Sequence, residues 1–490
     1  MVIIKASKLN LPHSTRPSLD ITSLLFEPSS NTLALMHTDS SILLLPSLSP
    51  FSPPSPFPLI QPQTLIPPLT TSYTFINLKS TPNSSNSRVL FVAAGPKESK
   101  IVLRFWILNR NRKLFVKSKI VSSNDQRGIV VDEKLGVLVD LNHGNSLKVV
   151  GNVNVLGLYS VSEGKIWVFG VKIVGDEEES VCVKLMKSVV VECSVPVYSI
   201  TVSMGFLVLG ESDGVRVIPL RGIMKGRVDK EREVVKRKGK KIVVRDCECE
   251  ENGRCRGASV REDKNCGFVG KVKCMENDNN GTRSIELRER VEKSLNGYVG
   301  KVEMNGVKSQ SKHRSVKLKQ DSNVGGTLFV PFNSLEAPCE ESSTKLLLSL
   351  RAVSIHSLSK KMFLVLDSDG DLHLLGLYRA SPGSDFTGHM KRLSCTMKVQ
   401  MLAVLPDTST RAQTIWVSDG VNTMHVMSLS DMEVPPSENK KIESMEMLMQ
   451  MQLSATEAVF ASEKVQNLAP LSANAVLVLG QGTIFAYAIS

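Results

Sequence analysis

A short apolar run, a tight polar turn and a second apolar run recur along this chain. The clearest copies are Leu33–Leu45, Phe206–Ile218 and Phe363–Leu375, and weaker copies are Gln413–Met427 and Ala475–Tyr487. Their turns hold Asp-Ser, Asp-Gly or Gln-Gly, which tolerate the positive φ that two-residue β-turns require. Each copy therefore predicts a β-hairpin, and the recurrence predicts an all-β repeat fold, for which the β-propeller is the natural candidate.

The spacing of the turns predicts the number of propeller blades. Turns fall near residues 39, 95, 144, 214, 370, 420 and 482. A four-stranded blade takes about 40–45 residues plus its loops. A further turn near Gly164 lies in the long gap between 144 and 214. We expect seven blades if Gly144 and Gly164 share a blade and eight if they do not, and we favour seven.

The two ends of the chain are predicted to meet in one blade. The last hairpin, Ala475–Ile489, ends the chain one strand short of four, and Val2–Leu9 has the pattern of a strand that would fill the place. Such pairing removes exposed sheet edges, which otherwise promote aggregation. The acid-free first 19 residues also resemble a transit peptide faintly, but we prefer the strand; no secretory signal or membrane span is expected.

Composition breaks the strand pattern between residues 221 and 325. Residues 221–320 contain 27 Lys and Arg against 15 Asp and Glu, whereas the rest of the chain has 33 of each. The segment buries too little apolar surface to offset chain entropy, which predicts disorder. We expect a single all-β propeller with its first blades in 1–220 and the remaining blades in 326–490, interrupted by a disordered basic insertion at 221–325.

Four apolar stretches resemble the third strand of the WD-repeat family, which usually ends in an apolar-x-apolar-Trp-Asp-apolar pattern. In Leu103–Leu108, Trp106 holds the Trp position and Ile107 stands where Asp is usual. Three further stretches keep only the apolar spacing: Ile42–Leu48, Val215–Leu220 and Leu372–Leu377. No Gly-His pair precedes them. The resemblance covers most of the chain outside 221–325 and implies a degenerate WD-repeat-like propeller, a fold that typically binds other proteins.

A compact basic cluster is the sharpest local feature of the insertion. It consists of Lys236, Arg237, Lys238, Lys240 and Lys241, and the stretch from 221 to 241 holds ten basic residues against three acids. Exposed Lys and Arg at this density fit the acidic grooves of nuclear import receptors, and also nucleic-acid phosphates. The alternative is a solvated charge run that keeps a loop soluble.

The cysteines do not form a convincing metal site. Five of the nine lie within 28 residues of the insertion: Cys247, Cys249, Cys255, Cys266 and Cys274. Zinc sites usually combine two close Cys or His pairs, and here the second tight pair is missing. We therefore expect no metal, and free thiols in a reducing compartment.

Signals of catalysis are weak elsewhere in the sequence. The phosphate-binding Gly-rich loop, the His-Glu-x-x-His zinc motif and the Gly-x-Ser-x-Gly elbow are absent. Asp367, Asp369 and Asp371 suggest a calcium loop faintly, but Tyr378 stands where such a loop needs Glu. Turn chemistry explains these aspartates better. Trp106, Trp167 and Trp416 are expected to pack inside blades, and no cofactor is expected.

These observations predict a non-catalytic, nuclear protein–protein interaction scaffold that contacts partners through its propeller faces. The basic insertion would serve import or contact an acidic partner. The alternative is a nucleic-acid-associated factor, for example in RNA-particle or ribosome assembly, that contacts phosphates through the insertion. Cytoplasmic residence remains the alternative location, and an enzyme is not expected.

Overall fold

The computed structural model describes residues 3–9, 11, 19–52, 62–80, 87–122, 126–144, 146–174, 181–225, 315–318, 326–332, 349–379, 386–405, 412–431 and 450–490. They all belong to one compact unit, Met1–Asp229 with Ser311–Ser490. A second unit, Lys230–Gln310, lies wholly outside the described residues.

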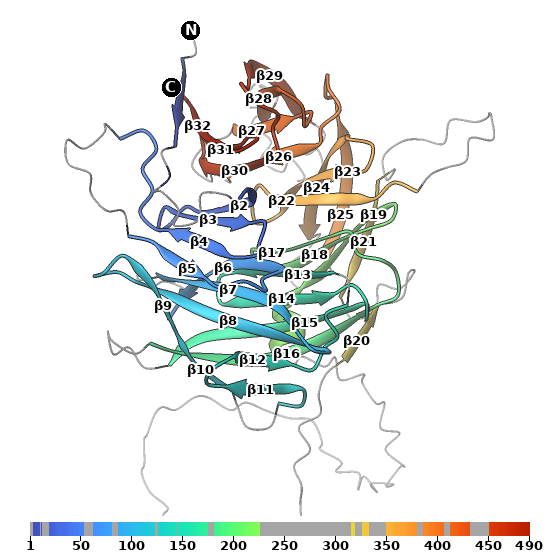
Figure 1. Cartoon of the computed structure of the whole chain (residues 1–490). Helices are drawn as coiled ribbons and strands as arrows, with labels where there is room; N and C mark the ends of the chain where they lie inside the picture. Colours follow the sequence, from blue (N-terminus) through green and yellow to red (C-terminus); the bar gives the residue numbers. More distant parts are fainter. Residues whose placement is uncertain are drawn as a thin grey trace, which may run out of the picture. The chain divides into compact units, whose positions relative to one another are not determined.

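The strands of the described residues form seven sheets, or blades, that follow one another along the chain (Figure 1). Blade 1 contains β2 (Ile21–Glu27), β3 (Thr32–His37), β4 (Ile42–Leu45) and β5 (Thr64–Ile66). Blade 2 contains β6 (Ser72–Lys79), β7 (Ser87–Lys97), β8 (Lys100–Asn109), β9 (Leu114–Lys117), β11 (Ile129–Asp132) and β12 (Gly136–Val139). Blade 3 contains β10 (Lys119–Ser122), β13 (Leu147–Asn152), β14 (Val155–Ser160), β15 (Lys165–Val174), β16 (Cys182–Cys193) and β20 (Ser315–Leu318).

The last four blades have four strands each. Blade 4 contains β17 (Ser199–Ser203), β18 (Phe206–Glu211), β19 (Gly214–Pro219) and β21 (Leu328–Pro331). Blade 5 contains β22 (Ala352–Ser357), β23 (Met362–Asp367), β24 (Leu372–Arg379) and β25 (Phe386–Leu393). Blade 6 contains β26 (Met401–Ala403), β27 (Gln413–Ser418), β28 (Thr423–Asp431) and β29 (Met451–Phe460). Blade 7 contains β30 (Asn467–Ser472), β31 (Ala475–Leu479), β32 (Ile484–Ile489) and β1 (Ile4–Lys8).

Seven hydrophobic clusters close the blades into a ring. Each cluster combines buried side chains of two neighbouring blades, from blades 1 and 2 through to blades 6 and 7. The remaining cluster joins blade 7 to blade 1, with Leu477 and Ala486 packed among Leu33, Leu35 and Leu45. The architecture is therefore a seven-bladed propeller, as predicted. Gly144 lies in the connection from β12 of blade 2 to β13 of blade 3, and Gly164 lies in the β14–β15 turn of blade 3.

The hairpin turns predicted from the sequence use the expected backbone conformations. Ser40, Asp213, Gly370, Gly420 and Gly482 all have positive φ and lie between the second and third strands of their blades. Asp and Gly are common at such positions because short polar side chains and the absence of Cβ lower the steric cost.

The N-terminal strand closes the last blade. β1 pairs antiparallel with β32, with Ile4 opposite Ile489 and Lys8 opposite Phe485, and both ends of the chain lie at this blade (Figure 1). This confirms the predicted closure. The four stretches that resemble WD-repeat third strands also lie in β4, β8, β19 and β24, each the third strand of its blade.

The basic insertion interrupts blade 4 between its third strand, β19, and its fourth strand, β21. The chain leaves after β19, forms the short helix α1 (Leu220–Lys225), and returns to pair β21 with β19. The prediction of disorder for all of 221–325 is wrong at both ends, because α1 forms at one end and β20 pairs in parallel with β16 at the other. Apolar anchors explain both exceptions, since Leu220 and Leu318 are buried in the cluster between blades 3 and 4.

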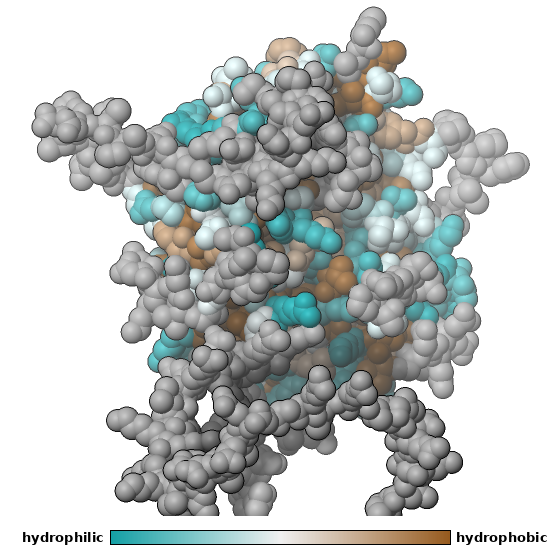
Figure 2. All heavy atoms as spheres, turned by 180° about the vertical axis from the view of Figure 1, so that it is seen from behind, coloured by the Kyte–Doolittle hydropathy of each residue, from teal (hydrophilic) through white to brown (hydrophobic). Residues whose placement is uncertain are grey.

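The tryptophans pack inside blades, as expected. Trp106, Trp167 and Trp416 are each less than 10% exposed. Trp106 lies 6.3 Å from Phe91, centroid to centroid, in the cluster between blades 1 and 2. Seen from behind, hydrophobic residues are scattered among hydrophilic ones over the visible surface (Figure 2).

Candidate binding face

Each blade presents its turns on two opposite edges. Because neighbouring strands in a blade are antiparallel, the turn after the first strand and the turn after the third strand lie at one edge, called the a–b face here. The turn between the second and third strands lies at the other edge, called the b–c face. In blades 2 to 5 the first strands contact one another in turn (β6 with β13, β13 with β17 and β17 with β22), so the turns that follow them lie close together on the a–b face.

Asparagine side chains connect the a–b turns of blades 2, 3 and 4. Asn154 Nδ2 donates to the Lys79 carbonyl at 2.7 Å, and Asn154 Oδ1 accepts from the Lys79 amide at 2.9 Å. Asn152 Nδ2 donates to the Val202 carbonyl at 2.6 Å. These bonds satisfy main-chain groups that the sheets leave unpaired, and they fix the turns of three blades relative to one another.

A hollow of about 610 Å³ lies among these turns. The residues that line it come from the a–b turns of blades 2 to 5 and from α1: Lys79, Ser80, Asn152, Val153, Asn154, Val155, Val202, Met204, Gly205, Leu220, Arg221, Met224 and Lys360. Val153 is 41% exposed and Met204 is 45% exposed. The hollow thus offers apolar contact area within a polar rim.

The ionisable residues that line the hollow all carry positive charge. They are Lys79, Arg221 and Lys360, and the lining contains no Asp or Glu. A second hollow, lined by turns of blades 1 and 2, contains Arg88, Arg110 and Lys113 and again no acid. Cations and no acid therefore line both hollows on the a–b face.

Several aspartates lie instead in the b–c turns, where their carboxylates accept hydrogen bonds from the turn amides. Asp39 Oδ1 accepts from the Ser41 amide at 2.9 Å, and Asp419 Oδ1 accepts from the Val421 amide at 2.8 Å. Asp367 Oδ1 accepts from the amides of Asp369 and Asp371, both at 2.9 Å. Turn chemistry therefore accounts for these acids, as expected from the sequence.

The Asp367 carboxylate also pairs with a buried histidine. Its Oδ2 lies 2.8 Å from His373 Nε2, and Phe332 stacks on that imidazole at 4.5 Å. Burial opposes ionisation of Asp367, but the hydrogen bonds from His373 and the turn amides outweigh it, so the pKa of Asp367 lies below its ordinary value. The carboxylate is occupied by these partners. No cluster of three His, Cys, Asp or Glu able to hold a metal occurs among the residues with described positions.

The predicted import or partner-contact residues Lys236, Arg237, Lys238, Lys240 and Lys241 lie outside the described residues. So do the five clustered cysteines, while Cys182, Cys193 and Cys395 are free thiols. Within the described ranges, no helix is both long enough and apolar enough to cross a membrane.

Sequence reasoning missed the basic hollow. Its three cations lie at two turns and in α1, almost 300 residues apart from first to last, and only the ring of blades brings them together. One signal was present in the sequence: the polar breaks between first and second strands of blades 3, 4 and 5 contain no acid.

The fold defines the class of this protein: it is a seven-bladed β-propeller. Similar solved structures are the WD40 repeats of RRP9 (9% identity, TM-score 0.41, covering 99% of this chain and 97% of that one) and U3-55K (10%, 0.40, 99% and 98%). The β-propeller domain of Cps50 (Swd1) from Myceliophteria thermophila is also similar (8%, 0.41, 99% and 100%). No protein-family model matches the sequence, and no curated protein matches it. The class therefore rests on the seven sheets and their closure.

Proposed function

We propose that this propeller is a non-catalytic protein-interaction scaffold whose a–b face docks an acidic segment of a partner protein. The observation that supports this is the hollow lined by Lys79, Arg221 and Lys360 without an acid. Exposed apolar groups beside these cations, at Val153 and Met204, would contact the hydrophobic residues of the same segment. Complementary charge of this kind accelerates encounter and suppresses wrong partners.

The basic insertion leaves the described part of the chain beside this hollow. It begins after α1, whose Arg221 and Met224 line the hollow. Lys236 follows Lys225 by eleven residues, so a fully extended chain would let the basic cluster reach at most about 40 Å from the end of α1. The insertion would hold an acidic partner near the hollow, and Lys236–Lys241 would serve as a nuclear import signal.

Charge reversal tests the docking role of the a–b face. In the full chain, Lys79→Glu, Arg221→Glu and Lys360→Glu are combined, and partners are identified by affinity purification with nuclease present. The matched control combines Lys100→Glu, Lys134→Glu and Lys464→Glu, three exposed lysines away from this hollow. We expect the first variant to lose partners that the control retains. Equal partner sets for the two variants would refute the proposal.

A nucleic-acid-associated factor is the second candidate, supported by the excess of cations in residues 221–320. Affinity for RNA or DNA would then fall steeply with salt, since each phosphate contact releases counterions. Replacing residues 226–314 by a flexible linker keeps α1, β20 and β21. Loss of partners on nuclease treatment favours the nucleic-acid role, and partners that survive nuclease favour the scaffold; the deletion then shows which of these partners need the insertion.

A fluorescent fusion tests the import signal. Alanine at Lys236, Arg237, Lys238, Lys240 and Lys241 is expected to leave the protein in the cytoplasm. The control places alanine at five other basic positions of the insertion: Arg254, Arg256, Arg261, Lys264 and Lys271. Nuclear accumulation of the first variant would show that import does not depend on this cluster.

A further inference from the structure

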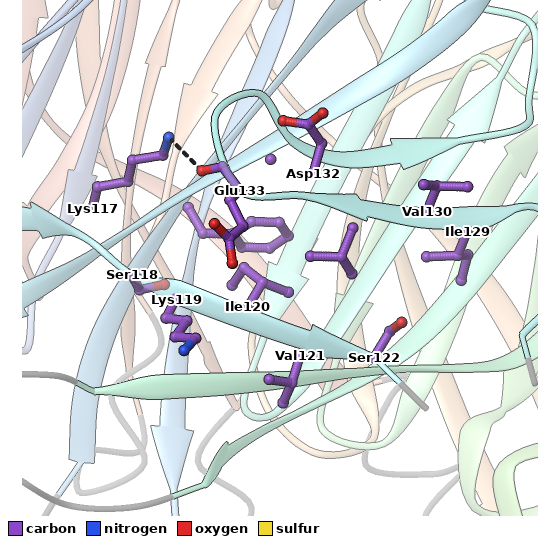
Figure 3. Close-up of a pocket in the computed structure, with 13 residues that line it drawn as sticks. Lys117, Ser118, Lys119, Ile120, Val121, Ser122, Ile129, Val130, Asp132 and Glu133 are labelled. Atoms are coloured by element: carbon purple, nitrogen blue, oxygen red, sulfur yellow. Dashed lines mark hydrogen bonds between the residues drawn. The ribbon is translucent and has the colours of Figure 1, made fainter. Parts of the chain in front are cut away.

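A groove of about 910 Å³ runs between the outer edges of blades 2 and 3 (Figure 3). One wall consists of Lys117–Ser122, which spans the end of β9 and all of β10, and the other consists of Ile129–Glu133, which contains β11. The chain passes from β9 on blade 2 to β10 on blade 3 and then returns to blade 2 with β11. The two strands thus belong to different sheets and leave a space between them.

Consecutive residues of both strands line this groove. A groove over the face of a strand is lined by alternate residues, because successive side chains point to opposite sides. Six residues in a row on one wall and five in a row on the other indicate that the groove runs along the strand edges, where main-chain groups point outward.

Both walls have main-chain groups that their sheets do not use. β11 is the last strand of its sheet among the described residues, and β10 pairs with β16 alone. The Asp140 amide donates to the Gly128 carbonyl, whereas the Ile129 amide turns back to Gln126 at 3.3 Å. By the alternation of an antiparallel ladder, the Val131 N–H and C=O point away from β12, toward the groove.

A buried hydroxyl on the floor of the groove lacks a partner. Ser118 lines the groove and is 8% exposed, and its Oγ has no hydrogen-bond partner among the described residues. Buried polar groups are almost always paired in folded proteins. A ligand that supplied a main-chain N–H or C=O here would satisfy it.

The side chains specify an extended segment without net charge. Phe105, Ile120 and Ile129 provide apolar lining. Lys117 and Lys119 on one wall, with Asp132 and Glu133 on the other, place two charges of each sign at the groove (Figure 3). Lys117 Nζ is already tied to the carbonyls of Glu133 and Lys134, at 3.4 and 2.7 Å. The opposed charges balance, which distinguishes this groove from the hollows on the a–b face.

We propose that the groove between β10 and β11 accepts an extended, uncharged segment of a partner protein as an added β-strand. The segment would pair with the free edge of β11, place apolar side chains against Ile120 and Ile129, and offer a main-chain group to Ser118. Main-chain hydrogen bonds give affinity in this mode of recognition, and pockets for alternate side chains give specificity.

A selection of phage-displayed random dodecapeptides on the full chain supplies the probe. We expect enriched peptides with apolar residues at alternate positions, whose affinity falls at least tenfold when alternate peptide amides are N-methylated. Amide hydrogen exchange should slow at Val131 when such a peptide binds. Enriched peptides without this alternation would overturn the proposal. So would peptides whose affinity is unchanged whichever of the two alternate sets of amides is N-methylated.

The matched variants are Val131→Pro and Val131→Thr. Proline removes the outward N–H but leaves the ladder to β12 intact, so we expect at least a tenfold loss of peptide affinity. Threonine keeps the N–H and the branched Cβ, so we expect less than a threefold change. Equal peptide affinity of the two variants would overturn the proposal. A concentration-dependent dimer that Val131→Pro abolishes would also overturn it, because a second copy of the chain would then occupy the groove. The N-methylated peptides test wild-type protein and do not depend on the folding of either variant.

Discussion

A buried ion pair in blade 4 yields a prediction about the stability of the blade that the insertion interrupts. Arg216 of β19 contacts Glu211 of β18 through two bonds, Nε to Oε1 at 2.6 Å and Nη2 to Oε2 at 2.9 Å. The two side chains are 1% and 2% exposed. Phe329 of β21, which follows the insertion, lies opposite Arg216 with its ring centroid 5.2 Å from the guanidinium carbon. The pair therefore supports the strand that completes the blade.

Glu211→Gln removes the negative charge of this pair, so the buried Arg216 guanidinium loses the charge of Glu211. Breaking a buried pair in this way costs about 3–5 kcal/mol, because the remaining charge loses its compensation. Replacing both residues, as Glu211→Leu with Arg216→Met, removes both charges from the interior. We expect this double variant to be at least about 2 kcal/mol more stable than Glu211→Gln.

Urea unfolding followed by tryptophan fluorescence measures these free energies. The control is Glu163→Gln, which breaks the 2.8 Å pair of Glu163 with Lys165; those side chains are 27% and 40% exposed, and the expected cost is about 0–1 kcal/mol. A loss below about 1 kcal/mol for Glu211→Gln, or a double variant no more stable than the single one, would refute the reasoning.

Three further predictions concern closure, pH and backbone packing. Deleting residues 1–9 exposes the edge of β32, so we expect concentration-dependent aggregation in size-exclusion chromatography, and a monodisperse monomer would contradict this. Burial lowers the pKa of His356 to about 4. Between pH 6.5 and 4 the unfolded chain therefore binds more protons than the folded chain. The free energy of unfolding then falls on acidification, by at most about 1.4 kcal/mol per pH unit, and His356→Asn should flatten this slope. At Gly95 an added Cβ would lie 1.7 Å from the Leu69 carbonyl oxygen, whereas at Gly222 of α1 nothing lies within 4 Å, so thermal unfolding should show a much larger loss for Gly95→Ala than for Gly222→Ala.

The hairpins were predictable because their determinants are local. Alternating apolar residues around Asp-Gly or Asp-Ser specify two strands and the positive φ between them, as at Asp213 and Gly370. Blade count followed from turn spacing, and closure by β1 followed from the missing strand of the last blade. The predicted third strands were also found, even where Ile107 replaces the usual Asp, since apolar spacing alone places them in the core.

The extra strands at the blade edges, β10 and β20, could not be predicted in this way. β10 crosses from blade 2 to pair in parallel with β16, and β20 does so from beyond the insertion. Four-residue segments of this kind lack the two apolar runs around a tight turn that mark the hairpins, and their pairing depends on which sheet edge is nearby in space. The groove beside β11 exists only because of this crossing.

The sequence by itself determined the all-β repeat, its turns, its closure and the position of the basic insertion, because each depends on periodicity or composition within a short window. Tertiary structure alone decided that Lys79, Arg221 and Lys360 share one hollow, that Glu211 and Arg216 form a buried pair, and that β10 and β11 leave their edges free. These features combine residues from separate turns, facing strands or neighbouring blades. The closing of seven sheets into a ring brings the separate turns and the neighbouring blades together. Glu211 and Arg216 already lie in one hairpin, and what the tertiary structure decides for them is their burial.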